Sequence, residues 1–166
     1  MAKVIYALGN DISTDIIYPG RHMATVLPTE TPQYAFADIK ELNELLRAQQ
    51  EPPGSVIVGG KNFGCGSSRE QAVSALNGYD LIIVAKNFAR IFLQNSINLG
   101  LRTVTCPDLE AAAGDILEIT PTAVLNATSR KTFRIIPMPS ARQAIVEAGG
   151  LISYTRKRIL AKSSVG

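Results

Sequence analysis

One run of residues, at positions 61–70, combines types that suit anion binding and proton removal. It reads Lys-Asn-Phe-Gly-Cys-Gly-Ser-Ser-Arg-Glu and lies between an apolar segment at 55–60 and a helical pattern. A strand that enters a glycine-rich turn before a helix leaves unpaired backbone N–H groups at a positive helix end. Ser67, Ser68 and Arg69 fall there, and together they would hold a carboxylate or phosphate. A serine whose alkoxide is favoured by the same positive field could also act as a base.

A structural role would explain the same turn. Serines commonly cap helices, and Glu70 could complete a capping box, so a short motif of this type is weak evidence by itself. Arg69 favours the functional interpretation, because a cation in the first turn of a helix opposes the helix dipole. We therefore expect a ligand or a partner carboxylate to compensate it.

Two other segments are dense in polar residues. Residues 10–22 read Asn-Asp-Ile-Ser-Thr-Asp-Ile-Ile-Tyr-Pro-Gly-Arg-His, where the aspartates would equally form turns and Arg21 would equally be a solvated loop charge. Residues 86–100 form an apolar helical pattern that includes Asn95 and Asn98, which we expect to tie loops together. Cys65 has no histidine near it in the sequence and is interpreted as a small residue in a tight turn.

Composition limits the class of protein. The chain has 166 residues, of which 46% are hydrophobic and 19% charged, so we expect one folded domain over residues 1–166 with a basic tail at about 155–166. Seventeen lysines and arginines against fourteen acidic residues give a net charge of +3, scattered along the chain. This suits a small anionic substrate. A nucleic-acid interface would need clustered cations and more aromatic residues, so we expect no nucleic acid.

Residues that bind metals are few. The cysteines are Cys65 and Cys106 and the histidine is His22, too few for a four-ligand zinc site without carboxylates or for an iron–sulfur cluster. We therefore expect no metal or cofactor on this chain. The absence of a signal region and of any run of about 18 apolar residues predicts no membrane association, a cytoplasmic location and reduced cysteines.

Hydrophobic periodicity predicts the order of the elements. Strands are expected at 4–8, 56–58, 81–85 and 102–105, with helices at 34–49, 68–77 and 88–99 and a long loop at 12–31. Alternating strands and helices imply right-handed crossovers and a parallel core. Short strands at 115–120, 123–126 and 132–136 then predict an antiparallel patch. A helix at 140–148 and a short, fraying helix in the tail complete an α/β fold.

Three of these segments, in this order, resemble one family. They are Thr14-Asp15-Ile16-Ile17 followed by Pro19, the run from Asn62 to Glu70, and Phe88-Ala89-Arg90-Ile91-Phe92 with Asn95-Ser96-Ile97-Asn98. The pattern, over residues 3 to about 150, resembles the small subunit of 3-isopropylmalate dehydratase, which is the counterpart of the swivelling domain of aconitase. The resemblance implies a three-layer β/β/α swivelling domain. It also implies a hydro-lyase that dehydrates a 2-hydroxy di- or tricarboxylate and rehydrates it at the neighbouring carbon.

The resemblance further implies partners and residue roles. A separate large subunit would carry the [4Fe–4S] cluster and complete a heterodimer or heterotetramer that acts on a small carboxylate, in the first place on 3-isopropylmalate and 2-isopropylmalate of leucine biosynthesis. Ser67 matches the base that removes the proton alpha to a carboxylate. Ser68 and Arg69 match substrate-binding neighbours, and Thr14, Asp15 and Arg21 are assigned to the edge of the substrate site.

The sequence departs from this family in one place. Where its small subunits often carry Tyr-Leu-Arg-Thr as a flexible specificity segment, this chain has His22, Met23, Ala24 and Thr25. The missing arginine predicts an uncharged or smaller 3-substituent, such as isopropyl or methyl. Related acids (2,3-dimethylmalate, methylmalate or citraconate, homoaconitate) and a non-catalytic anion-binding module remain alternatives. A nucleotide-binding turn is disfavoured, because the P-loop ending and the Gly-x-Gly-x-x-Gly spacing are both missing.

Overall fold

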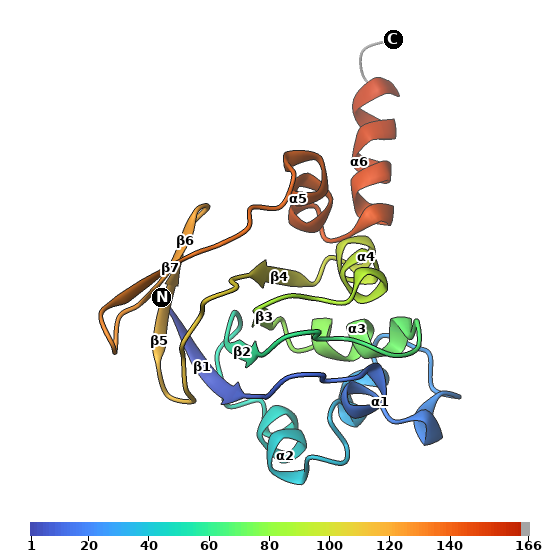
Figure 1. Cartoon of the computed structure of the whole chain (residues 1–166). Coiled ribbons are helices and arrows are strands. Elements are labelled where there is room, and N and C mark those ends of the chain that lie inside the picture. The colour runs from blue at the N-terminus through green and yellow to red at the C-terminus, as the bar shows by residue number, and fades with distance from the viewer. Residues whose placement is uncertain (164–166) are drawn as a thin grey trace.

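A mixed sheet of seven strands organises the chain (Figure 1). The computed structural model describes residues 1–163, and its strands lie in the order β4-β3-β2-β1-β5-β6-β7. Four of them are parallel neighbours: β1 (Ala2–Ala7), β2 (Val56–Gly59), β3 (Ile82–Ala85) and β4 (Arg102–Thr105). The antiparallel strands are β5 (Ile116–Ile119), β6 (Ala123–Asn126) and β7 (Lys131–Arg134). β1 also pairs with β5 and so joins the two parts of the sheet.

Alternate residues of the parallel strands face two separate cores, as the period of a strand requires. One buried cluster contains Ile5, Ile57 and Ile83 together with side chains of the helices. The other contains their neighbours Val4, Val56 and Val84, and also Leu117 of β5 and Val124 of β6. The antiparallel strands therefore curl back over one face of the parallel strands while helices cover the other face (Figure 1). The predicted β/β/α layering is confirmed.

The helical elements connect the strands and cover their outer face. They are α1 (Thr14–Ile17), η1 (Gly20–His22), η2 (Thr31–Tyr34), α2 (Lys40–Ala48), α3 (Glu70–Asn77) and α4 (Arg90–Leu99). After β7 come α5 (Ser140–Glu147) and α6 (Leu151–Ser163), and α6 stands out from the rest of the molecule (Figure 1). No helix within residues 1–163 is long and apolar enough to cross a bilayer.

The prediction of a continuous helix over 34–49 is wrong. The 3-10 turn η2 ends at Tyr34, and Phe36 adopts a positive φ of 52° before α2 begins at Lys40. The Phe36 side chain is fully buried and its N–H donates to the carbonyl of Ile17 at 2.8 Å. This tertiary contact fixes a turn where the apolar spacing alone favours a helix. The amide of Asn43 completes the turn by donating to the carbonyl of Ala35 at 2.8 Å.

Other predicted boundaries shift by a few residues. The third helix begins at Glu70, two residues later than predicted, and the fourth begins at Arg90 instead of residue 88. The predicted loop at 12–31 contains the short helix α1 and the turn η1. The tail forms a longer helix than predicted, since α6 already begins at Leu151. Residues 164–166 of the predicted tail helix lie outside the described residues.

Candidate active site

The candidate site lies where the loops after β1 and β2 meet, at the carboxyl ends of the parallel strands. The two loops continue the pairing of their strands through backbone hydrogen bonds from Gly60 to Gly9, from Gly64 to Ile12 and from Thr14 to Cys65, at 2.7–2.9 Å between N and O. This edge of an open parallel sheet is where ligands bind in α/β proteins. A hydrogen bond joins Thr14 to Ser67, which follows 53 residues later in the sequence. The Thr14-Asp15 segment and the serine–arginine turn therefore lie side by side at the site.

The glycine turn is built against the motif at 88–92. Phe63 is fully buried and packs edge-to-face on Phe88 and Phe92, with ring centroids 5.9 and 5.5 Å apart. Its backbone is also tied to the next crossover, because the N–H of Phe63 donates to Asn87 and the N–H of Ala89 donates to Phe63. The motif at 88–92 therefore packs against the turn, and its hydrogen bonds hold the turn backbone in place.

A substitution at Gly64 tests how closely the turn packs against Phe92. It has a φ of +80°, and a Cβ at this position would overlap the ring of Phe92. We expect Gly64→Ala to reduce the free energy of unfolding by roughly 3 kcal/mol, from backbone strain plus overpacking. Urea unfolding curves measure this. The matched control is Gly114→Ala, where φ is +94° but no atom lies within 4 Å of the new Cβ, so only the strain of about 1 kcal/mol should appear. Equal losses in the two variants would contradict the packing argument.

Helix capping does not explain the serines. The residue at the N-cap of α3 is Arg69, and no side chain makes a capping hydrogen bond there. Within the described residues, no hydrogen bond engages the hydroxyl of Ser67 or Ser68, and the N–H groups of Gly66, Ser67 and Ser68 also lack a partner. Both serines are exposed. The turn thus presents two hydroxyls and a row of donors to the space in front of the α3 N-terminus.

A carboxylate compensates Arg69, which is one of the two possibilities that the sequence leaves open. The Arg69 guanidinium forms an ion pair with Asp15 and donates to the carbonyl of Tyr18 at 3.2 Å. Asp15 is set in place by α1, whose N-cap Ser13 accepts from the N–H of Ile16 at 3.2 Å. The Arg69 side chain is 15% exposed and that of Asp15 is 62% exposed. The Arg69 cation is therefore largely buried, whereas its partner carboxylate on Asp15 is exposed to solvent.

Thr14 and the serine turn are joined directly. The buried Thr14 hydroxyl donates to the carbonyl of Ser67 at 2.9 Å, which fixes the backbone that carries the serine. The structure thus brings together Thr14, Asp15, Ser67, Ser68 and Arg69.

Arg21 is engaged outside this group. Its guanidinium makes two hydrogen bonds to Asp38, at 3.0 and 2.6 Å, and both side chains are exposed. The hydrogen bonds from Arg21 lower the pKa of the Asp38 carboxyl below its usual range. Nothing in the local sequence indicates this pair, because Asp38 belongs to the turn that the periodicity mistakes for a helix.

Aromatic residues anchor the segment from His22 to Thr25, which follows shortly after Gly20, a neighbour of Arg69. A Cβ on Gly20 would lie 3.6 Å from the Arg69 guanidinium. The His22 ring stacks on Tyr34 with centroids 4.1 Å apart, and the fully buried Tyr18 places its hydroxyl 3.2 Å from the carbonyls of both His22 and Thr25. Burial, and secondarily Tyr34, raises the pKa of Tyr18. Met23 and Ala24 face solvent, so the segment is an anchored loop with an exposed tip.

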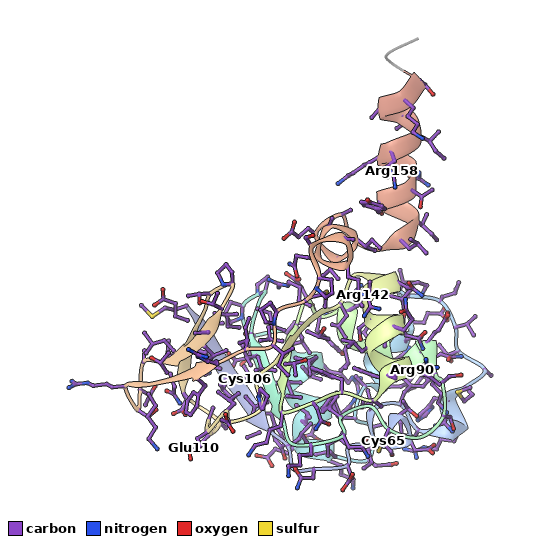
Figure 2. The ribbon with its side chains drawn as sticks, turned by 45° about the horizontal axis from the view of Figure 1, so that its top comes forward. Cys65, Arg90, Cys106, Glu110, Arg142 and Arg158 are labelled. Atoms are coloured by element: carbon purple, nitrogen blue, oxygen red, sulfur yellow. The ribbon has the colours of Figure 1, made fainter. Side chains whose placement is uncertain are left out.

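Few side chains among the described residues could bind a metal ion. Cys65 is half-buried in the turn, whereas Cys106 is buried in the core between the parallel and the antiparallel strands, and the two lie apart (Figure 2). Burial raises the pKa of the Cys106 thiol to about 11. Within residues 1–163, no three His, Cys, Asp or Glu side chains gather as a ligand set. The residues described here do not fit an iron–sulfur cluster.

Comparison with known proteins places these features in a family. The family model for the aconitase C-terminal domain matches residues 24–109. The 3-isopropylmalate dehydratase small subunit of Methanosarcina mazei is 38% identical over 158 residues, which cover 93% of this chain and 95% of that protein. This chain belongs to the aconitase family of hydro-lyases. Its relatives also include the methanogen homoaconitase small subunit of Methanocaldococcus jannaschii, 38% identical over 164 residues that cover 97% of this chain and 94% of that protein.

A solved structure from this aconitase family shares the whole architecture. A crystal structure of 3-isopropylmalate dehydratase from Methanocaldococcus jannaschii matches with a TM-score of 0.88 at 36% sequence identity. The match covers 99% of this chain and 98% of that chain, so it extends through α6. The chain is thus a small subunit of the isopropylmalate dehydratase type.

Proposed function

We propose that this chain supplies the base and the carboxylate-binding groups of a hydro-lyase that interconverts 3-isopropylmalate and 2-isopropylmalate. The observation that carries the proposal is the exposed Ser67 hydroxyl, which lies in one turn with the largely buried Arg69 and with three N–H groups that have no partner among residues 1–163. Such a cluster stabilises an anion in the substrate and an alkoxide on the serine. A separate large subunit, in a heterodimer or heterotetramer, is proposed to complete the enzyme in the cytoplasm.

Each residue has a stated task in this proposal. Ser67 takes the proton alpha to a carboxylate onto its Oγ as the hydroxyl group leaves the neighbouring carbon, and it returns the proton when water adds back. Arg69 and Ser68 hold the carboxylate next to the carbon that loses the proton, where negative charge accumulates. Thr14 holds the Ser67 backbone, and Asp15 holds the Arg69 fork. We assign the Lewis-acid assistance to the departing hydroxyl to a [4Fe–4S] cluster on the large subunit.

The surroundings of the segment His22–Thr25 support an uncharged substituent on the substrate. Met23, Ala24 and Thr25 carry no charge, and the neighbouring Arg21 is paired with Asp38. A second carboxylate on the substituent would therefore meet no free guanidinium among the described residues of this segment. An isopropyl group, in contrast, fits the exposed apolar side chain of Met23.

Homoaconitate is the second candidate, because the methanogen homoaconitase small subunit is as similar to this chain as the dehydratase subunits are. The test is a substrate panel on the reconstituted pair of subunits: isopropylmalate, 2,3-dimethylmalate, methylmalate, homocitrate, homoaconitate and citrate. We expect no turnover from either subunit alone and the highest kcat/KM of the pair on isopropylmalate. Equal kcat/KM on homoaconitate would overturn the substrate assignment. No turnover of any acid by an assembled pair would favour the non-catalytic anion-binding module.

A further inference from the structure

Helix α6 carries an apolar face that the rest of the described chain leaves open. It has no buried residue along its 13 positions, and Ile152, Ile159 and Leu160 are 77%, 60% and 63% exposed. The helix rises from the α4–α5 side of the molecule and points away from the sheet (Figures 1 and 2). Large exposed apolar side chains grouped on one element usually mark an interaction site.

These apolar side chains form one continuous stripe. Leu151, Thr155 and Ile159 recur every four residues, which places them on one face of a helix, and Ile152 lies beside them. Together with two flanking residues they line an open depression along α6, whose members are Leu151, Ile152, Thr155, Arg156, Ile159 and Leu160. Ser153 and Tyr154, by contrast, are half-buried at the base of the helix, where it contacts α4 and α5. The stripe therefore faces outward.

The direction of α6 is fixed by the turn from which it starts. Gly149 and Gly150 have φ values of +86° and +109° and close a Schellman motif on α5, with N–H groups donating to Val146 and Ile145 at 2.9 Å. A Cβ on Gly150 would lie 2.6 Å from the carbonyl oxygen of Asn98 in α4. Two helices thus hold the base of a third in one orientation, although that third helix covers no core.

An isolated helix of this length gains little stability by itself. Helices shorter than about 12–15 residues are marginal in water, and most draw their stability from burying an apolar face. With 13 residues and none fully buried within residues 1–163, α6 gains little of this contribution from the rest of the described chain. The match to the solved dehydratase structure, with a TM-score of 0.88, covers 99% of this chain, so the residues of α6 fall within the matched range.

We propose that the apolar stripe of α6 docks into a groove of the large subunit, as an amphipathic helix docks into an apolar groove edged by carboxylates. The inference rests on the proposed function in naming the large subunit as the occupant. The charge of the helix supports that occupant: residues 151–163 contain Arg156, Lys157, Arg158 and Lys162 and no acidic residue. Figure 2 shows Arg158 on this helix, and Arg142 lies on the adjoining α5. The groove must therefore be apolar at its floor and acidic at its rim.

The same features disfavour two other occupants. A second copy of α6 would set four cations against four cations, with no carboxylate in the helix to pair with them. A membrane surface is bound by helices whose apolar face carries Trp, Phe or Leu over a wide area. The stripe of α6 carries no Trp or Phe, and the aromatic residue of the helix, Tyr154, lies at the half-buried base instead.

The test compares two double variants on opposite faces of α6. Ile152→Gln with Ile159→Gln makes the apolar stripe polar, and Lys157→Arg with Ala161→Gln changes the opposite face while keeping all four cations of the helix; glutamine and arginine are both good helix formers. Each full-length variant is titrated with the large subunit and followed by sedimentation and by turnover. We expect the stripe variant to raise the Kd for the large subunit at least about tenfold, with kcat restored at saturating large subunit. The opposite-face variant should change the Kd less than about threefold.

The readouts separate failure of this inference from failure of the proposed function. An unchanged Kd in the stripe variant overturns the docking surface even if the wild-type pair is active. Assembly of the wild-type pair without turnover overturns the activity and leaves the docking surface standing, provided that the stripe variant still assembles poorly. Concentration-dependent dimerisation of the chain alone, or co-sedimentation with anionic phospholipid vesicles, that the stripe variant abolishes would replace the large subunit as occupant and overturn the proposal.

Discussion

Replacing the Ser67 hydroxyl with hydrogen, in Ser67→Ala, is expected to lower kcat of the reconstituted enzyme by about 10³-fold while the chain remains folded. Removal of a positioned general base typically costs 10²–10⁴-fold. The fold should be unaffected, because the Ser67 hydroxyl is exposed and makes no hydrogen bond within residues 1–163. The backbone carbonyl that accepts from Thr14 is retained in the variant. Steady-state turnover of the mixed subunits, with a urea unfolding curve of the variant alone, measures both expectations.

The neighbouring serine provides the matched control. Ser68→Ala removes an equally exposed hydroxyl one residue away, and we expect it mainly to raise KM, since Ser68 is assigned to the substrate carboxylate. A second readout isolates the proton transfer: cleavage of the carbon–deuterium bond in substrate labelled at the carbon alpha to the carboxylate should stop in Ser67→Ala and continue in Ser68→Ala. Loss of the label from that carbon at the wild-type rate in Ser67→Ala would refute the assignment of the base.

Sequence patterns identify the layers of this fold because burial is periodic in them. The apolar run of β2 predicts a strand covered on both faces, and the alternation in β6 predicts its bounds correctly at Ala123–Asn126. Sequence patterns fail where a contact with a residue distant in the sequence determines the backbone conformation. Phe36 has helical spacing from Ile39 and Leu42, yet its hydrogen bond to Ile17 and its buried ring force a left-handed turn.

The candidate site shows the same division. The chemistry of Ser67, Ser68 and Arg69 can be predicted from one short stretch of sequence, because a turn before a helix is a local structure. The pairing of Arg69 with Asp15 spans 54 residues, and a partner carboxylate could be expected without being identified from the run itself. The pairing of Arg21 with Asp38 has no sequence signal, because exposed ion pairs carry no periodicity. Long-range partners follow from the topology, which places the loops after β1 and β2 side by side.

Arg69→Lys is expected to lower kcat/KM by roughly 10–100-fold, chiefly through KM. The wild-type guanidinium uses one nitrogen for both Asp15 and the Tyr18 carbonyl, and its other nitrogens make no hydrogen bond within residues 1–163, so they can bind a ligand. A lysine ammonium is a single point of charge and cannot hold the carboxylate of Asp15 and the carboxylate of a substrate in one plane. Loss of a hydrogen bond to a charged group costs about 1.5–3 kcal/mol, which corresponds to this range.

The chain offers a control with the same chemistry at a distance from the site. Arg102 also pairs with an aspartate, Asp80, at 2.9 Å, but its side chain is 44% exposed and lies at the far end of β4. Arg102→Lys should therefore change kcat/KM less than about twofold, since an exposed ion pair contributes little. Asp15→Asn completes the comparison: it keeps the cation but releases the fork, so we expect a smaller rise in KM than in Arg69→Lys. If Asp15→Asn instead lowered KM, Asp15 would be competing with the substrate for Arg69, and its role as a support for the fork would be wrong.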